Sequence, residues 1–317
     1  MARATLCGVA HPLLRLSAEV AAALASGRPV VALESTLITH GLPAPRNLEA
    51  AQRAEAAVRA GGATPATIAV HGGRILVGLT ATDSETLAAA PEPWKVSRHN
   101  LAAALGRPGW SGTTVSATMI AAHLAGIEVF ATGGIGGVHR GGQDSMDISS
   151  DLDELARTPV AVVCAGPKSI LDVPRTLEAL ETRGVPVVGW GTTELAGFFS
   201  PTSGLPVAIT VDDAPAAADL WRRHRSLGLG SGMVFAVPIP AADGIPHDEI
   251  EGAIATAELG ASAAGIHSAA ATPWILARVA ELTDGRSVAA NLALIENNAR
   301  VAASLAVALV AVGLPRA

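Results

Sequence analysis

Short apolar runs rich in β-branched residues alternate with alanine-rich stretches along the chain, and this alternation restricts the fold more than any other feature. Strands that alternate with helices are typical of α/β proteins, in which helices cover the faces of a sheet. The apolar runs predict strands at residues 29–33, 67–70, 74–79, 129–131, 160–165, 185–190, 207–209 and 233–237. The alanine-rich stretches predict helices at residues 47–60, 114–125, 173–183, 214–227, 248–259, 273–282 and 287–312.

The second and third predicted strands are joined by His71-Gly72-Gly73-Arg74, which is typical of a β-hairpin turn. One antiparallel pair among strands otherwise separated by helices predicts a mixed, largely parallel sheet. The glycine-rich stretch at residues 228–232 is too short to separate two domains. We therefore expect a single three-layer α/β/α domain over residues 1–317.

The composition suits a large core and excludes several kinds of partner. Half of the residues are apolar and 16% are charged. The net charge is −6 and the strongest basic cluster is Arg222-Arg223-His224-Arg225, so we expect no nucleic-acid partner. No uninterrupted apolar run reaches the roughly 18 residues of a membrane span. We expect no membrane association, and we expect residues 301–314 to form part of a packed helix.

Cysteine usage and the N-terminus indicate the compartment. Cys7 and Cys164 are the two cysteines; the first lies near a terminus and the second in a predicted strand, so we expect no disulfide. The first twenty residues lack the layout of a signal peptide. Both observations favour a cytoplasmic protein.

Of the 22 lysine and arginine residues, only Lys95 and Lys168 are lysines. Arginine stays protonated and cannot act as a nucleophilic amine, whereas a partly desolvated lysine can attack a carbonyl and form an imine. Lys168 follows the strongly apolar run at residues 160–167, which favours this role. The alternative is codon bias that left two surface lysines.

Two short segments are further candidates for a site. Glu34 directly follows a predicted strand, where open α/β sheets place their ligands, although it could instead cap the next helix. Lys95, Ser97 and Arg98 lie within four residues and could form an anion site or a solvated loop.

A longer polar segment leads from the strand at residues 129–131 to Lys168. Six glycines between residues 133 and 142 could approach a ligand closely and present N–H groups to a phosphate, although their spacing matches no nucleotide motif. Asp144, Asp147 and Asp151 follow among serines. A helix N-cap at Ser149 or Ser150 explains part of this cluster, and a hard divalent cation would explain all three acids.

In combination, these segments resemble the pseudouridine-5′-phosphate glycosidase family. The resemblance covers residues 29–305 in the same order. Serine stands at position 150, where alanine is common, and positions 131 and 167 also vary, but no required functional group is lost. The similar motifs are Glu34-Ser35, Ile38-Thr39-His40-Gly41, Thr132 through Arg140, Ser145-Met146-Asp147-Ile148-Ser149, Ala165-Gly166-Pro167-Lys168-Ser169-Ile170-Leu171-Asp172 and Ser287-Val288-Ala289-Ala290-Asn291.

The resemblance implies a homotrimeric lyase that reversibly cleaves pseudouridine 5′-phosphate into uracil and ribose 5-phosphate, with one Mn²⁺ per subunit. Uracil is attached through carbon, so the family's reaction passes through a ring-opened lysine imine. Lys168 matches the nucleophile, Glu34 the proton donor and Asp147 the metal ligand. The matches to substrate contacts and pocket residues are Lys95, Val115, Ser149, Ser150, Asp151, Thr132, His139 and Asn291.

Two other interpretations use the same residues. A Schiff-base lyase or aldolase acting on another sugar phosphate would also need the lysine, the acid and an anion-binding loop. A non-catalytic sugar-phosphate sensor would need the pocket but no nucleophile. The presence of Glu34, Asp147 and Lys168 together favours an enzyme over a sensor.

Overall fold

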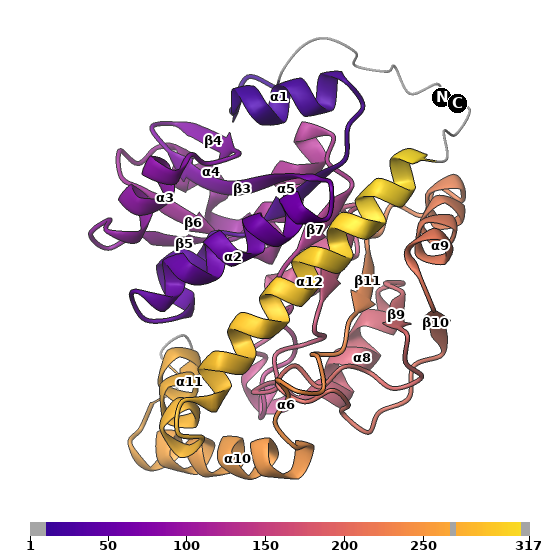
Figure 1. The fold of residues 1–317 in the computed structure, drawn as a ribbon. Helices are drawn as coiled ribbons and strands as arrows, with labels where there is room; N and C mark the ends of the chain where they lie inside the picture. The colour runs from indigo at the N-terminus through magenta and orange to yellow at the C-terminus, as the bar shows by residue number, and fades with distance from the viewer. Residues whose placement is uncertain (1–10, 267–270, 312–317) are drawn as a thin grey trace.

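The computed structural model describes residues 11–266 and 271–311, and within them eleven strands form one sheet (Figure 1). The main path of the sheet runs β1-β4-β3-β2-β7-β8-β11-β9-β10, with β6 paired to β3 and β5 paired to β6. The strands are β1 Leu14–Leu16, β2 Val30–Leu33, β3 Thr64–His71, β4 Arg74–Val77, β5 Trp94–Val96, β6 Ser111–Thr113, β7 Val129–Ala131, β8 Ala161–Cys164, β9 Val187–Trp190, β10 Ile209–Val211 and β11 Met233–Ala236.

The sheet is mixed and largely parallel, as the sequence predicts. Strand β3 runs antiparallel to β4 and to β6, and the other described pairs are parallel. The β3–β4 connection is the predicted hairpin. Gly72 and Gly73 have φ of +56° and +75°, a conformation that side chains other than glycine rarely adopt.

Helices cover both faces of the sheet, which confirms the three-layer architecture. In β2, Val31 and Leu33 belong to one buried cluster, and Val30 and Ala32 belong to another on the opposite face. Successive side chains of a strand point to opposite faces, so both faces of β2 are packed. The helices on the Val31 face include α2 Arg46–Ala60, α9 Ala214–Ser226 and α12 Arg286–Ala311. Those on the Val30 face include α1 Ala18–Ala25, α5 Val115–Ala125, α7 Ser150–Leu155 and α8 Val173–Thr182.

Helix α12, yellow in Figure 1, runs across the sheet between α2 and α9. It is long and apolar enough to cross a membrane by length and composition alone. Its buried side chains, among them Leu294, Ile295, Ala302 and Leu305, pack in the same cluster as β2 and α2. We therefore interpret α12 as a core helix, in agreement with the packed helix expected from the sequence.

The remaining helical segments lie at the ends of the sheet or between strands. They are η1 Leu37–Gly41, α3 Ala81–Ala88, η2 Arg98–Asn100, α4 Leu101–Leu105, α6 Gly142–Ser145, α10 His247–Ala263 and α11 Ala271–Leu282.

The sequence-based prediction missed or misplaced several short elements, among them the helices α1, α3 and α4. The strand expected at 207–209 is β10 at Ile209–Val211, and β1, β5 and β6 were not predicted. Each of these four strands has three residues and includes a polar one, so none reads as a continuous apolar run as β7 does. Residue 312, the predicted end of the last helix, and Cys7 lie outside the described residues. Cys164 is buried in β8, where burial raises the pKa of its thiol to about 12.

Candidate active site

The predicted catalytic residues follow three neighbouring parallel strands. Glu34 comes directly after β2, Thr132 after β7, and Lys168 four residues after the end of β8. The order β2-β7-β8 places the carboxyl ends of these strands side by side. Ligands of open α/β sheets bind at this edge, so the fold brings the acid and the lysine to one side of the sheet.

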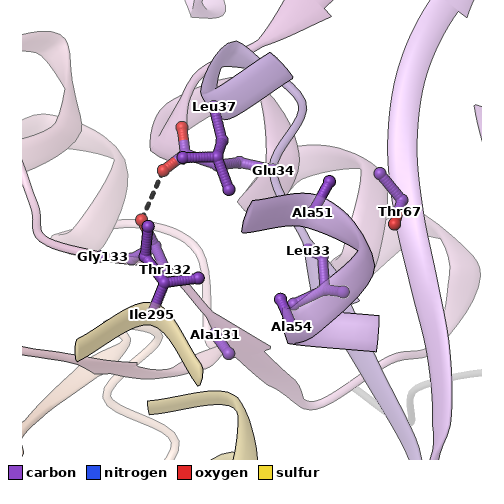
Figure 2. A pocket seen from close by; sticks show the side chains of 10 residues that line it. All are labelled: Leu33, Glu34, Leu37, Ala51, Ala54, Thr67, Ala131, Thr132, Gly133 and Ile295. Atoms are coloured by element: carbon purple, nitrogen blue, oxygen red, sulfur yellow. Dashed lines mark hydrogen bonds between the residues drawn. The ribbon is translucent and has the colours of Figure 1, made fainter. Parts of the chain in front are cut away.

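The Glu34 carboxylate is held by two threonines. The hydroxyl of Thr36 donates a hydrogen bond to Oε2. The hydroxyl of Thr132 donates one to Oε1, drawn as the dashed line in Figure 2. Glu34 is half-buried, whereas both threonines are buried. The alternative that Glu34 caps the next helix is not observed, because both oxygens accept from hydroxyl groups.

A cavity of about 20 Å³ lies beside Glu34, which is room for roughly one water molecule. Apart from Glu34, Thr67 and Thr132, the wall is apolar or glycine. This wall separates one side of Glu34 from bulk water. The residues that line the cavity are Leu33, Glu34, Leu37, Ala51, Ala54, Thr67, Ala131, Thr132, Gly133 and Ile295 (Figure 2).

Lys168 lies on a loop that pairs with the glycine-rich loop after β7. The Lys168 N–H donates to the Ile135 carbonyl at 3.1 Å, and the Ile135 N–H donates to the Gly166 carbonyl at 3.1 Å. Gly166 has φ +84°, and a Cβ at this position would lie 2.6 Å from the carbonyl oxygen of Ala196. Only glycine fits this turn, which places the half-buried Lys168 directly after it.

Lys95, on β5, shares an electrostatic environment with Lys168 and Glu34. Although the Lys95 side chain is solvent-accessible, the surrounding protein displaces much of the water around its ammonium group, and this burial lowers its pKa. The charge of Lys168 lowers that pKa further, while Glu34 and Asp151 oppose the shift. The pKa of His40 is also lowered, first by burial and then by Lys95. These effects indicate that Lys95 lies close enough to Lys168 and Glu34 for their charges to interact.

The predicted anion cluster at residues 95–98 is reduced to Lys95. Arg98 turns to Glu154, to which its Nε and Nη2 donate at 2.5 and 2.7 Å. The Ser97 hydroxyl lies 2.9 Å from the Thr114 hydroxyl. Arg98 and Ser97 are therefore occupied within the protein, a pairing that spacing along the sequence did not reveal.

The glycine-rich loop approaches the first turn of α5 through Asp151. The Asp151 carboxylate accepts the Ser116 N–H at 3.0 Å and the Gly136 N–H at 2.9 Å. A Cβ at Gly136 would lie 2.7 Å from Asp151 Oδ2, so this position requires glycine. Val115 is the buried first residue of α5, and Ser149 is the N-cap of α7, as one alternative predicted.

The three acids of the segment 144–151 do not converge. Asp151 is buried and bonded to the backbone, whereas Asp147 is partly exposed and its Oδ2 lies 3.9 Å from His139 Nδ1. Within residues 11–266 and 271–311, no group of three His, Cys, Asp or Glu side chains is placed to hold a metal ion. The three-carboxylate metal site is therefore not formed. Asp147 fits a cation that takes most of its oxygen ligands from water.

Asn291 and His139 lie near the loops just described. A Cβ at Gly133 would lie 3.6 Å from the Asn291 Oδ1, which places Asn291 beside Thr132. The His139 N–H donates to the Asp147 carbonyl at 3.0 Å. Sequence reasoning missed Asn298, whose amide donates to the Thr132 carbonyl at 2.9 Å. Its position two helical turns after Asn291 was the available signal.

Three further residues of this region were also missed. Thr36 binds the acid, Glu154 binds Arg98, and Ser116 joins α5 to α7. Thr36 lies two residues from Glu34, which is a usable signal. Glu154 and Ser116 carried none, because their partners are distant in the sequence.

The family model for indigoidine synthase A-like proteins matches residues 19–308. The chain is 56% identical over 299 residues to a pseudouridine-5′-phosphate glycosidase of Methylobacterium nodulans, covering 94% of this chain and 89% of the relative. It is also 56% identical over 298 residues to a pseudouridine-5′-phosphate glycosidase of Herpetosiphon aurantiacus, covering 93% of this chain and 98% of the relative.

Two solved structures share the fold. The prealnumycin C-glycosynthase AlnA, in complex with ribulose 5-phosphate, is 41% identical with a TM-score of 0.89, over 95% of this chain and 98% of that one. An indigoidine synthase A-like protein from Thermotoga maritima is 33% identical with a TM-score of 0.85, over 96% of this chain and 99% of that one.

Proposed function

The chain belongs to the indigoidine synthase A-like protein family, and we propose that it is a pseudouridine-5′-phosphate glycosidase. It reversibly cleaves the carbon–carbon glycosidic bond of pseudouridine 5′-phosphate to give uracil and ribose 5-phosphate. The observation that carries this proposal is that Glu34 and Lys168 follow β2 and β8 at one edge of the sheet, with Lys95 near enough for its charge to interact with both. Sequence identity of 51–56% to glycosidases over more than nine-tenths of the chain supports it.

Lys168 is the nucleophile in this proposal. Its neutral amine forms a bond to C1′ of the ribose as the C1′–O4′ bond breaks, and the ring oxygen takes a proton from Glu34. The nitrogen loses a proton, which restores the Glu34 acid.

The opened sugar then releases uracil. The nitrogen lone pair forms a C1′=N iminium, and the electron pair of the carbon–carbon bond moves to the uracil carbon, which takes a proton from Glu34. Water hydrolyses the iminium to ribose 5-phosphate and returns Lys168. An arginine at position 168 could not supply the electron sink.

In this proposal the substrate phosphate is bound by Lys95 and the first turn of α5, and the sugar carbon C1′ lies at Lys168. Lys95 supplies the cation, and the first turn of α5 at Val115 supplies a partial positive charge. The Asp151 carboxylate already accepts two backbone N–H groups. We therefore propose that, within residues 149–151, the hydroxyl and backbone groups of Ser149 and Ser150 contact the substrate.

The remaining matched residues line the sugar and base end. Thr132 holds Glu34, Asn291 on α12 lies beside Thr132, and His139 lies on the loop after β7. Asp147 would hold one Mn²⁺, whose charge would stabilise negative charge on the bound substrate. The proposal also includes a cytoplasmic location and assembly as a homotrimer.

A second candidate is a C-glycosidic bond-forming or bond-breaking lyase with another base or another sugar phosphate. The 41% identity to a C-glycosynthase that binds ribulose 5-phosphate favours the same chemistry with a different acceptor. The higher identity to glycosidases favours uracil as the base.

The experiment mixes purified protein with pseudouridine 5′-phosphate and Mn²⁺ and follows free uracil by chromatography. We expect stoichiometric uracil and ribose 5-phosphate, and the reverse reaction from the two products. EDTA should suppress turnover and Mn²⁺ should restore it. Absence of uracil, with cleavage of another C-glycosidic phosphate, would favour the second candidate. Normal turnover in metal-free protein would exclude the metal.

A further inference from the structure

Glu154, on α7, carries a carboxylate that is fully buried. A buried charge is costly unless it is paired and hydrogen-bonded. Arg98 supplies both the opposite charge and two hydrogen bonds, since its Nε lies 2.5 Å from Oε2 and its Nη2 lies 2.7 Å from Oε1. The Thr158 hydroxyl also donates to this carboxylate. The paired geometry fixes the orientation of the Arg98 guanidinium and ties Arg98 to α7.

The backbone of Arg98 is tied to the same helix by a second route. Its N–H donates to the Ser116 hydroxyl at 3.1 Å, and the Ser116 N–H donates to Asp151 Oδ1 at 3.0 Å. Asp151 and Glu154 lie three residues apart on α7, so these bonds form a closed ring through η2, α5 and α7. The other Asp151 oxygen accepts the Gly136 N–H, which extends the ring to the glycine-rich loop.

Lys95 lies three residues before Arg98, on a strand that needs such an anchor. Strand β5 has three residues and pairs with β6 alone among the described strands. The Thr114 N–H donates to the Val96 carbonyl at 2.8 Å, and the Ser97 and Thr114 hydroxyls lie 2.9 Å apart. The loop after Lys95 is therefore held against the first turn of α5 and against α7.

We propose that the Arg98–Glu154 pair is a positioning device that holds Lys95 against the first turn of α5 for binding of the substrate phosphate. Arg98 acts through Lys95 and does not touch the substrate, because two of its guanidinium nitrogens are bound to Glu154. The inference rests on the proposed function, in which Lys95 binds the phosphate.

The test compares Arg98→Lys with the natural protein. Lysine keeps the charge near Glu154 but cannot make the two-point contact, so the loop should lose its fixed position while the helix keeps a cation. We expect KM for pseudouridine 5′-phosphate and Kd for ribose 5-phosphate to rise about tenfold, with kcat within about twofold, since Lys168 and Glu34 are unchanged. Glu154→Gln leaves an amide oxygen that can still accept one bond from Arg98. Its KM and Kd should lie between those of the natural protein and those of Arg98→Lys.

Arg183→Lys is the matched control. The Arg183 Nε donates to Asp153 Oδ1 at 2.7 Å, so this pair involves the same helix α7, but at an exposed carboxylate and with no bond to Arg98. We expect its KM to stay unchanged. Thermal unfolding of each variant separates a loss of stability, which would lower the active fraction and thus the apparent kcat, from a loss of position, which raises KM.

A double-mutant cycle with Lys95→Met decides whether Arg98 acts through Lys95. In the Lys95→Met background, Arg98→Lys should cause no further rise in KM or Kd. Additive effects, or an unchanged KM in Arg98→Lys alone, would overturn the inference. If the natural protein releases no uracil, the proposed function fails. Calorimetry with ribose 5-phosphate would still test the positioning role in that case.

Discussion

The two lysines share one site but differ in what each must do. Lys168 follows a turn that only glycine can make, and its N–H is bonded to the glycine-rich loop, so its position is set by backbone. Lys95 is on a short edge strand and stays accessible to solvent. A nucleophile needs a fixed position and an amine that can lose its proton, whereas a phosphate-binding cation needs its charge to be held near the phosphate.

We expect Lys168→Arg to abolish turnover and Lys95→Arg mainly to weaken binding. The guanidinium at position 168 cannot form an imine, whereas at position 95 it keeps a cation near the phosphate. Borohydride with ribose 5-phosphate should attach a pentitol phosphate to the peptide that carries Lys168. Mass spectrometry of the digest provides the measurement, and a label on Lys95 would reverse the two roles.

Glu34→Gln should lower kcat by roughly a hundredfold or more, the usual effect of losing a general acid. Glutamine keeps the shape and can still accept from Thr36 and Thr132, but it carries no acidic proton. Ribose 5-phosphate and Mn²⁺ should still bind, as measured by titration calorimetry. Loss of metal binding together with activity would indicate that Glu34 is a metal ligand.

Lys95 is expected to reduce stability in exchange for function. Its pKa is lowered below the ordinary 10.5, first by burial and then by Lys168, so the folded state disfavours the ammonium form. This penalty is fully present below the folded-state pKa and disappears as the pH rises from that value toward 10.5. Lys95→Met should therefore raise the free energy of unfolding near pH 7 by less than about 1 kcal/mol, and Tm with it, because the group is partly solvated. The gain should shrink as the pH approaches 10.5.

The Tm of Lys95→Arg is the control for this prediction, since arginine keeps the charge. A gain in Lys95→Met that stays unchanged as the pH rises through 10.5 would indicate a packing effect unrelated to the charge.

Among elements, the loops after β7 and β8 depend on close backbone contacts. A Cβ at Gly134 would lie 2.6 Å from the Phe198 ring and 2.9 Å from the Gly166 carbonyl. Phe198 has φ +62°, which is unusual for a bulky residue, and its N–H donates to the Ala165 carbonyl at 3.1 Å. Phe198 thus packs behind the loop that leads to Lys168, in a conformation that the surrounding contacts impose.

Gly134→Ala should lower kcat on the order of tenfold or more, because the added methyl group must displace the Phe198 ring or the Gly166 carbonyl and thereby move Lys168. Gly109→Ala is the control, since its Cβ would meet no atom within 4 Å. Steady-state kinetics of the two variants decide the outcome. Equal activity would show that the loop accommodates the methyl group without moving the lysine.

Strands were predictable from the sequence where they form continuous apolar runs. Short strands with polar residues and side-chain pairs between residues distant in the sequence were not predictable. The runs that became β2, β3, β7 and β8 were predicted because buried strands read as continuous apolar segments. Strand β5 was missed because it has three residues, two of them exposed. The Arg98–Glu154 pair joins residues 56 positions apart, and no local pattern encodes such a contact.

At the scale of the whole molecule, the site is assembled by the topology of the sheet. Glu34 and Lys168 are far apart in sequence, and they meet because β2, β7 and β8 are consecutive and parallel. The mixed sheet was predictable from the hairpin, but the order of its strands was not, since crossover connections leave no local trace in the sequence. Family resemblance provided the site residues that topology could not.

The surface of the described chain leaves several large apolar side chains exposed. Leu227 is 71% exposed, Leu229 is 61% exposed and Leu259 is 74% exposed. Single exposed leucines are ordinary, but a pair within three residues of each other can contribute to a subunit contact. Family resemblance implies a homotrimer, and such a contact would bury these side chains.

We therefore predict a mass near three times 31.8 kDa by light scattering at micromolar concentration. In a closed ring of three, each subunit offers two different surfaces, so a charge placed on either one weakens every contact. Leu227→Glu and Leu259→Glu change the two exposed regions separately, and the variant that lowers the mass identifies the surface that is buried. A mass of 31.8 kDa for the natural protein would contradict the trimer. It would also require each subunit to complete its site with its own residues.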